Sequence, residues 1–246
     1  MMRIHKLSKA FDKTGQVEWP CPACGQLTLE IIQESLYEAP TSENRGMQDE
    51  LWFEADMYSG VFCCMAKCSR SQCREVVCCS GISRYESGWE HEKGTVYWQV
   101  FKPVNFVPAL NPFTIKVECP EEISEPLAAS FSVYLAQPGS AANLIRITVE
   151  RLLTAIGVPE RNDKGKRIVL HERLEKHLPD NYSDYASPLM AIKFLGNAGS
   201  HTLDEVKVRD IEDAFEIMEY VVNDIFSKRK ESIEVLTKRL NQRFGK

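Results

Sequence analysis

The stretch Cys21-Pro-Ala-Cys24-Gly25 decides how the first half of this chain folds. In such a knuckle the chain turns tightly enough for both thiolates to face one metal ion, and the glycine accepts the backbone angles of the turn. A closed tetrahedral zinc site needs four ligands, and the knuckle supplies two of them. The sequence therefore predicts a second pair of cysteines in the same half of the chain.

The second pair must come from a cysteine cluster further along the chain. Eight of the nine cysteines lie between residues 21 and 79. Cys68 and Cys73 are separated by four residues, about the length of one loop, whereas Cys64 and Cys68 form a competing pair. We predict a structural Zn²⁺ ion held by Cys21, Cys24, Cys68 and Cys73, with Cys64 as the alternative ligand. Such a site has no open coordination position and is not expected to catalyse a reaction.

Length and composition fit an ordinary globular protein. The chain has 246 residues, of which 43% are hydrophobic and 26% are charged. This is enough for one good core and a small second module, and it excludes a disordered or collagen-like chain. The N-terminus lacks the apolar segment of a secretory signal, and the longest uncharged stretch, residues 126–145, is too polar to span a membrane. Clustered cysteines in a reducing compartment favour metal binding over disulfides, so we expect a cytoplasmic protein without a membrane contact.

The chain divides into two modules and a tail. Residues 1–118 hold runs of β-branched and aromatic residues, such as 94–101, which predict short strands. From Pro120 onward apolar residues recur every three or four positions, which predicts helices. We therefore expect an α+β protein with a zinc ribbon and short β-strands at 1–118, an all-α bundle of about five helices at 119–226, and a basic helical extension at 227–246.

Charge is distributed unevenly along the chain. Residues 1–126 carry 12 basic and 18 acidic side chains, a net charge of −6, whereas the last twenty residues carry seven basic and two acidic side chains, a net charge of +5. The formal net charge of the whole chain is −5, which does not indicate a general nucleic-acid binder. The tail fits either a local basic surface or a solvated helix face.

The second half contains one polar stretch between apolar helices, GNAGSHT at residues 196–202. We predict that this stretch is a loop, because Gly196 and Gly199 provide sharp turning and let a ligand approach the backbone. His201 titrates near neutral pH, and Asn197 can orient it or bind a phosphate. The alternative is a helix-capping loop with a hydrogen-bonded histidine.

Four further residues belong to the candidate surface around this predicted loop. Ser200 adds a hydroxyl group, and Lys193, about one helical turn before Asn197, can offset anionic charge. Arg146 and Glu150 lie four residues apart on an earlier helix. They either form an ion pair along that helix or face the loop and its ligand.

Two stretches carry a family resemblance: PLMAIKFLGNAGSHT at residues 188–202 and SAANLIRITVERLL at residues 140–153. They resemble the domain-of-unknown-function 4145 family, which is grouped with the HEPN (higher eukaryotes and prokaryotes nucleotide-binding) superfamily of helical domains. The CPACG and KCSRSQC arrangement is similar to the zinc-containing N-terminal portion of many members. The resemblance implies a HEPN-like helical bundle and a homodimer, since HEPN domains often pair around the functional loop.

The superfamily also suggests functions. Its members include metal-independent ribonucleases, nucleotide-transfer toxins and accessory proteins of these, many in restriction, toxin–antitoxin or antiphage systems. In the ribonucleases an arginine and a polar neighbour are followed, four to six residues on, by the histidine of the site. This chain has no arginine at that distance before His201, and the nearest upstream basic residue is Lys193.

We therefore expect a prokaryotic, defence-associated module that binds nucleic acid, a nucleotide or a partner protein and is non-catalytic or weakly catalytic. One alternative is a metal-independent endoribonuclease, in which His201 is the acid–base residue, Asn197 orients it, and Lys193 with Arg146 offsets phosphate charge. Lysine would be weaker than arginine in that role because it lacks a bidentate fork. The other alternative is a structural dimerisation scaffold.

Overall fold

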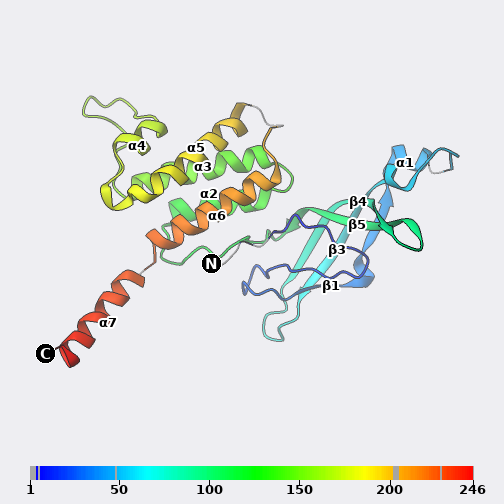
Figure 1. The fold of residues 1–246 in the computed structure, drawn as a ribbon, viewed down its shortest axis with the longest axis horizontal. Helices are drawn as coiled ribbons and strands as arrows, with labels where there is room; N and C mark the ends of the chain where they lie inside the picture. Colours follow the sequence, from blue (N-terminus) through cyan, green and yellow to red (C-terminus); the bar gives the residue numbers. More distant parts are fainter. Residues whose placement is uncertain (1–3, 5, 48, 202–204, 228, 246) are drawn as a thin grey trace.

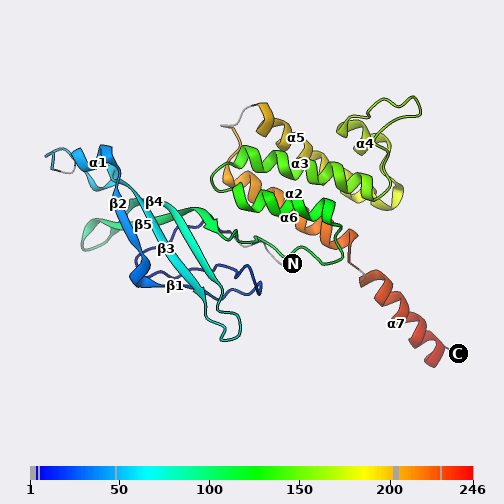
Figure 2. The same ribbon diagram turned by 180° about the vertical axis from the view of Figure 1, so that it is seen from behind.

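The chain folds into an antiparallel β-sheet followed by a group of helices (Figure 1). This computed structural model describes residues 4, 6–47, 49–201, 205–227 and 229–245. Figure 2 shows the same arrangement from behind: the sheet and the helical group lie side by side, and the C-terminal helix projects away from both. The expected α+β organisation is confirmed.

Five strands form the sheet, and every pair of neighbouring strands is antiparallel. The third strand pairs with the first and second strands along one side and with the fourth along the other, and the fifth completes the sheet. The strands are β1 (Leu29–Ile31), β2 (Tyr37–Pro40), β3 (Ser59–Cys68), β4 (Val76–Glu90) and β5 (Gly94–Val107). Short helices lie between β1 and β3: η1 (Gln33–Ser35), α1 (Ser42–Met47) and η2 (Ala55–Met57).

The side chains of β3 show why this sheet forms. They alternate between exposed and buried, as the two-residue period of a strand requires. Phe62, Cys64 and Ala66 face the core, where they are 3%, 2% and 0% exposed. The N-terminal segment packs on this face, because the ring of Phe11 lies against that of Phe62, with ring centroids 5.5 Å apart, and Phe11 exchanges backbone hydrogen bonds of 3.0 and 2.7 Å with Phe101 of β5. The first half thus forms a curled sheet with one buried face, and its β4–β5 hairpin is longer than the short strands predicted.

The second half is helical. Its elements are α2 (Glu121–Val133), α3 (Pro138–Ala155), α4 (Leu170–Lys176), η3 (Asp180–Tyr185), α5 (Ala186–His201), α6 (Val208–Ile225) and α7 (Arg229–Phe244). α2, α3, α5 and α6 pack around a shared core, in which Ile123, Ile145, Leu189 and Phe215 are each 0% exposed. The apolar periodicity of the sequence reflects this core, since each helix turns one apolar stripe toward it.

One continuous core links the sheet to the helices. The segment after β5 places the ring of Phe113 against Phe131 of α2, with ring centroids 5.1 Å apart. The N-terminal segment also reaches the helices, where the Ser8 hydroxyl donates a 2.6 Å hydrogen bond to the Glu212 carboxylate of α6. These two segments hold the sheet against the helical half.

The stretch predicted to be a loop is helical instead. α5 runs through both glycines and ends at His201, so the loop prediction is wrong for residues 196–201, and Thr202 lies outside the described residues. The physical reason is the close crossing of α5 and α3: a Cβ atom on Gly199 would lie 2.5 Å from the carbonyl oxygen of Gly139. Glycine at this position therefore allows two helix backbones to approach, rather than allowing a turn.

α7 is the predicted helical extension, and it is the most peripheral helix (Figure 1). Its described side chains are all exposed to solvent. Neither α7 nor another helix in the described part of the chain has the apolar length that a bilayer crossing requires.

Candidate functional site

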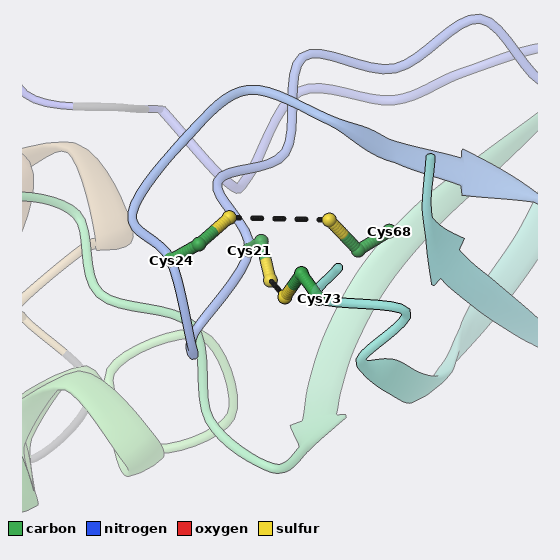
Figure 3. A group of neighbouring side chains, drawn as sticks. All are labelled: Cys21, Cys24, Cys68 and Cys73. Carbon is green, nitrogen blue, oxygen red and sulfur yellow. Dashed lines mark hydrogen bonds between the residues drawn. The ribbon is translucent and has the colours of Figure 1, made fainter. Parts of the chain in front are cut away.

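Four thiols gather near the end of β3 (Figure 3). Cys21 and Cys24 belong to the turn before β1, Cys68 is the last residue of β3, and Cys73 lies in the turn between β3 and β4. The four sulfur atoms all lie within 4.8 Å of one another. Those of Cys21 and Cys73 are 3.6 Å apart, and those of Cys24 and Cys68 are 3.9 Å apart. The structure thus brings together the four cysteines that the sequence predicted as metal ligands.

Two hydrogen-bonded turns place these thiols. In the first, the N–H group of Gly25 donates to the carbonyl of Cys21 over 2.8 Å, and Gly25 has a φ of 69°, which glycine adopts without strain. In the second, the N–H group of Cys73 donates to the carbonyl of Arg70 over 3.0 Å. Antiparallel pairing of β1 with β3 then brings the two turns together.

Hydrogen-bond donors around the cluster favour the thiolate form of two cysteines. The Thr28 hydroxyl lies 3.1 Å from the sulfur of Cys68 and lowers the pKa of that thiol. The backbone N–H group of Gln26 lowers the pKa of Cys24 to about 6. Burial acts in the opposite direction on Cys21 and raises its pKa to about 12. A bound cation would favour the thiolate at all four positions, because metal coordination deprotonates a thiol.

The spacing of the sulfur atoms fits a four-coordinate ion. A tetrahedral site with zinc–sulfur bonds of about 2.3 Å separates its sulfur atoms by roughly 3.8 Å. The two pairs of sulfurs measured above, at 3.6 and 3.9 Å, lie on either side of that value. The four cysteines are therefore able to hold a metal ion without rearrangement of the fold.

The competing ligand, Cys64, lies outside this cluster. It is 2% exposed in β3 and is the register partner of Cys79 in β4, which is 0% exposed. Among the described residues, the cluster of Cys21, Cys24 and their two partners is the single group of three or more histidine, cysteine or acidic side chains close enough to share a metal ion. The buried Cys64 and Cys79 thiols instead pack within the sheet core.

The other predicted site residues lie where α5 crosses α3. Gly196 packs against Arg146, because a Cβ atom on Gly196 would lie 2.5 Å from the Cβ atom of Arg146. The Ser200 hydroxyl lies 3.3 Å from the amide oxygen of Asn143 in α3, and it donates to the carbonyl of Gly196 over 2.9 Å. These residues therefore form a helix–helix contact.

A small ion-pair network on α3 joins Arg146 and Glu150 to Arg167. A guanidinium nitrogen of Arg146 lies 3.4 Å from one carboxylate oxygen of Glu150, and Arg167 lies 2.9 Å from the other oxygen. The pairing with Glu150 directs Arg146 toward the C-terminal end of α3. His201, which follows Ser200, lies near the N-terminal end of α3 instead. The first alternative for Arg146 and Glu150, an ion pair along the helix, is the arrangement that the structure has.

Lys193 and Asn197 lie one helical turn apart on α5. The Lys193 ammonium group lies 4.1 Å from the ring centroid of Phe194, and the Asn197 side chain is half-buried. The side chain of His201 lies outside the described residues, so its acid–base role stays a prediction. The positive groups of Lys193 and Arg146 are thus engaged by an aromatic ring and a carboxylate.

A cavity between the two halves was missed by the sequence analysis. It has a volume of about 690 Å³ and is lined by Ser8 and Lys102 from the first half and by the N-terminal ends of α3 and α6 from the second. Three of the four charged side chains lining it are cationic, namely Lys102, Lys207 and Arg209. The fourth, Glu212, accepts the hydrogen bond from Ser8.

Two long helices begin at this cavity. Pro138 is the first residue of α3, and Val208 is the first residue of α6; both line the cavity, and both helices are 18 residues long. The N-cap of α3, Gln137, makes no side-chain hydrogen bond to the helix. A helix N-terminus carries a partial positive charge because its first N–H groups have no partner within the helix. The N-terminus of α3 therefore adds to the positive charge of the three cationic side chains, whereas at α6 the Asp210 carboxylate accepts a hydrogen bond from the N–H group of Lys207 over 2.8 Å and offsets the charge of the helix end.

The sequence held only part of the information needed to find this cavity. A proline such as Pro138 commonly marks the first turn of a helix, so the sequence indicates where α3 begins. Nothing in the spacing indicates that Ser8 and Lys102 lie close to residues 207–209, which are about a hundred residues or more away along the chain. The cavity depends on the packing of the two halves.

Comparison with known proteins matches the two halves separately. Residues 9–108 match the family model of a domain of unknown function (DUF8608), and residues 128–243 match that of a second domain of unknown function (DUF4145). The second match agrees with the resemblance carried by residues 140–153 and 188–202. No curated protein and no solved structure matches the chain.

Proposed function

We propose that this protein is a non-catalytic binding module that holds a phosphate-bearing ligand, a nucleotide or a nucleic acid, in the cavity between its two halves. One observation carries the proposal: three cationic side chains and the uncapped N-terminal end of the long helix α3 line the same cavity. The N-terminus of a helix suits a phosphate group because backbone N–H groups and the helix dipole both favour negative charge.

The size and chemistry of the cavity support this ligand class. Its volume of about 690 Å³ lies within the range of small-molecule sites, roughly 300–1,000 Å³. Arg209 can bind a phosphate through two parallel hydrogen bonds, whereas Lys102 contributes a point charge. Glu212, held by Ser8, offers an acceptor for a hydroxyl or amino group of the same ligand.

The arrangement of α5 supports binding rather than cleavage. The stretch expected to present His201 in a loop belongs to a helix that packs against α3, and Arg146 is paired with Glu150. Phosphodiester cleavage without a metal needs an acid–base group and a cation around one phosphate. Among the described cations, Lys102, Lys207 and Arg209 line one cavity with a single acidic side chain, whereas three arginines line a smaller cavity together with Glu150 and Glu160. A defence-associated setting stays a prediction from the family resemblance.

We further infer that the four-cysteine cluster holds a structural Zn²⁺ ion. Four soft thiolate ligands whose sulfur atoms lie within 4.8 Å of one another support zinc over magnesium or calcium, which take oxygen ligands. With Cys21, Cys24, Cys68 and Cys73 as ligands, no coordination position is left for a substrate. The ion would tie the turn before β1 to the turn after β3 and so stabilise the sheet.

Isothermal titration of the full chain tests the binding proposal with three ligands: inorganic pyrophosphate, ATP and a single-stranded RNA oligonucleotide. We expect Arg209→Gln and Lys102→Gln each to weaken binding about tenfold, which corresponds to about 1.4 kcal/mol. The matched control is Arg84→Gln, which removes an exposed β4 arginine that pairs with Glu86 and does not line the cavity. Affinity for pyrophosphate and ATP identifies a free nucleotide as the source of the phosphate, whereas affinity for RNA alone identifies a nucleic acid.

Three results would revise these proposals. Failure of all three ligands to bind, or an equal loss of affinity in Arg84→Gln, would contradict the anion site. Chelator-resistant RNA cleavage that is abolished by His201→Ala would replace the binding module with an endoribonuclease.

The zinc proposal requires one zinc per chain by elemental analysis. The zinc should be lost in Cys24→Ser and kept in Cys63→Ser, whose thiol is exposed outside the cluster.

A further inference from the structure

α7 projects away from the other described elements (Figures 1 and 2), and one of its faces is apolar and exposed. Four large apolar side chains recur at intervals of three, four and four residues, which places them on one side of a helix. These side chains are Ile233, Leu236, Leu240 and Phe244, and they are 52%, 41%, 53% and 67% exposed. A stripe of this kind normally packs against another surface, because its exposure to water is unfavourable.

An apolar groove lies on the helical half between α4 and α5. It has a volume of about 510 Å³, and its lining includes Leu174 of α4 and Ala186, Met190, Ala191 and Phe194 of α5. The Phe194 side chain is 56% exposed at this groove. Met190 is unbranched and adapts to the shape of an incoming side chain. The groove therefore has the character of a surface that receives an apolar helix.

The charges around the stripe and the groove are complementary. The last twenty residues, which contain α7, carry a net charge of +5. Residues 172–194, which include the whole lining of the groove, carry four acidic and three basic side chains. Among the basic ones, Arg173 is buried with 4% exposure and Lys193 lies over the ring of Phe194, whereas Glu175 is the one charged side chain in the lining. A basic helix and an acidic rim attract each other and fix the orientation of docking.

We propose that α7 of one copy lies in the α4–α5 groove of a second copy, and that the exchange is reciprocal about a two-fold axis. This inference goes beyond the proposed phosphate binding and does not depend on it. Each of the two contacts covers a stripe of four apolar residues and one groove.

Charge argues against the simplest rival, a direct pairing of α7 with α7 of the second copy. That pairing would bring together two tails that each carry a net charge of +5, so like charges would repel along the contact. Docking into the groove instead places the basic helix beside Glu175. It also covers Met190 and Phe194, which the α7–α7 pairing would leave exposed.

Sedimentation equilibrium of the full chain at several concentrations tests the proposal. We expect a dimer for the unmodified protein and at least a tenfold higher dissociation constant for the stripe variant Leu236→Ser/Leu240→Ser. The groove variant Met190→Arg should have the same effect, because it fills the groove and repels the basic helix. Val235→Ser is the matched control, since Val235 is 65% exposed on the opposite face of α7. Circular dichroism of each variant establishes that it is folded.

Mixing the two defective variants separates the possible arrangements. The stripe variant keeps an intact groove and the groove variant keeps an intact α7, so a mixture should form heterodimers through one restored contact. A groove variant that dimerises alone would overturn the proposal in favour of α7–α7 pairing. A monomeric unmodified protein would overturn it as well, whether α7 stays in solvent, packs on its own chain or binds a membrane. Pyrophosphate binding by monomeric variants separates a failure here from a failure of the anion site.

Discussion

Gly199 shows how one residue supports two different interpretations. A residue without a Cβ atom permits a turn, and it also permits another backbone to come close. The sequence favours the turn, because a histidine, an asparagine and a second glycine surround this position. The structure uses the close approach: a Cβ atom at Gly199 would lie 2.5 Å from the carbonyl oxygen of Gly139 and 2.9 Å from the Cβ atom of Ala142. The contact partner lies sixty residues earlier in the chain, so local sequence does not show it.

Replacing Gly199 with alanine should destabilise the protein by about 1–3 kcal/mol, because the added methyl group must displace the backbone of α3. Gly46→Ala is the matched control. Gly46 is also helical, in α1, and its Cβ atom would meet nothing within 4 Å, so alanine should be neutral or stabilise by up to about 1 kcal/mol. Urea unfolding followed by circular dichroism measures both changes. Unchanged stability of Gly199→Ala would contradict the close helix crossing.

At the scale of single elements, α4 depends on one buried arginine. The helix has only seven residues, too few to be stable alone in water. The guanidinium of Arg173 donates to the carbonyls of Glu150 and Val158 over 3.1 and 2.9 Å and to the Thr154 hydroxyl over 2.9 Å. These acceptors lie at the end of α3 and just after it. Arg173 therefore anchors α4 to α3 from inside.

Arg173→Met should cost about 1–3 kcal/mol, because it keeps most of the side-chain volume and leaves the buried carbonyl of Val158 without its guanidinium donor, together with two part-buried acceptors on α3. Arg167→Met is the control from the same surface. The Arg167 side chain is 75% exposed, and loss of its pair with Glu150 should cost no more than about 1 kcal/mol. Thermal unfolding compares the two variants, and limited proteolysis of residues 157–169 reports whether α4 detaches. Equal costs for both arginines would refute the anchoring role.

The elements differ in how far sequence could predict them. Local spacing was sufficient for the cysteine cluster, since two short turns hold all four thiols and strand pairing supplies the rest. Apolar periodicity was sufficient for most of the helices, because each one buries a single face. It was insufficient for Arg173, whose charged side chain marks a solvent position in any periodic pattern but is 4% exposed. The polar acceptors that keep it buried come from another helix.

At the scale of the whole molecule, the two segments matched by separate family models share one continuous core. The contacts between them come from the N-terminal segment and from the connection after β5, which places Phe113 against Phe131. The proposed phosphate site lies at this junction, so it needs both halves, whereas the cysteine cluster lies wholly within the first. Tertiary packing creates the junction, so the local sequence indicates the cluster but not the cavity.

Metal removal should therefore open the molecule locally. The cluster joins two turns of the sheet, and no ligand comes from the helical half, whose core residues Ile145 and Phe215 are 0% exposed. Hydrogen exchange after treatment with a strong chelator and a reductant should show lost protection in residues 19–31 and 66–77 and retained protection in α3 and α6.

Two cysteine variants serve as controls for the hydrogen-exchange experiment. Cys24→Ser should reproduce the pattern without a chelator, because it removes one of the four ligands, and Cys63→Ser should respond to the chelator as the unmodified protein does. Simultaneous loss of protection in α3 and α6 would mean that the shared core makes the two halves unfold as one unit. Unchanged exchange throughout would mean that the cluster contributes no metal to the stability of the sheet. Loss of protection in the first half alone is expected only if a bound ion stabilises that half and the buried apolar side chains of the helical half keep it folded without the ion.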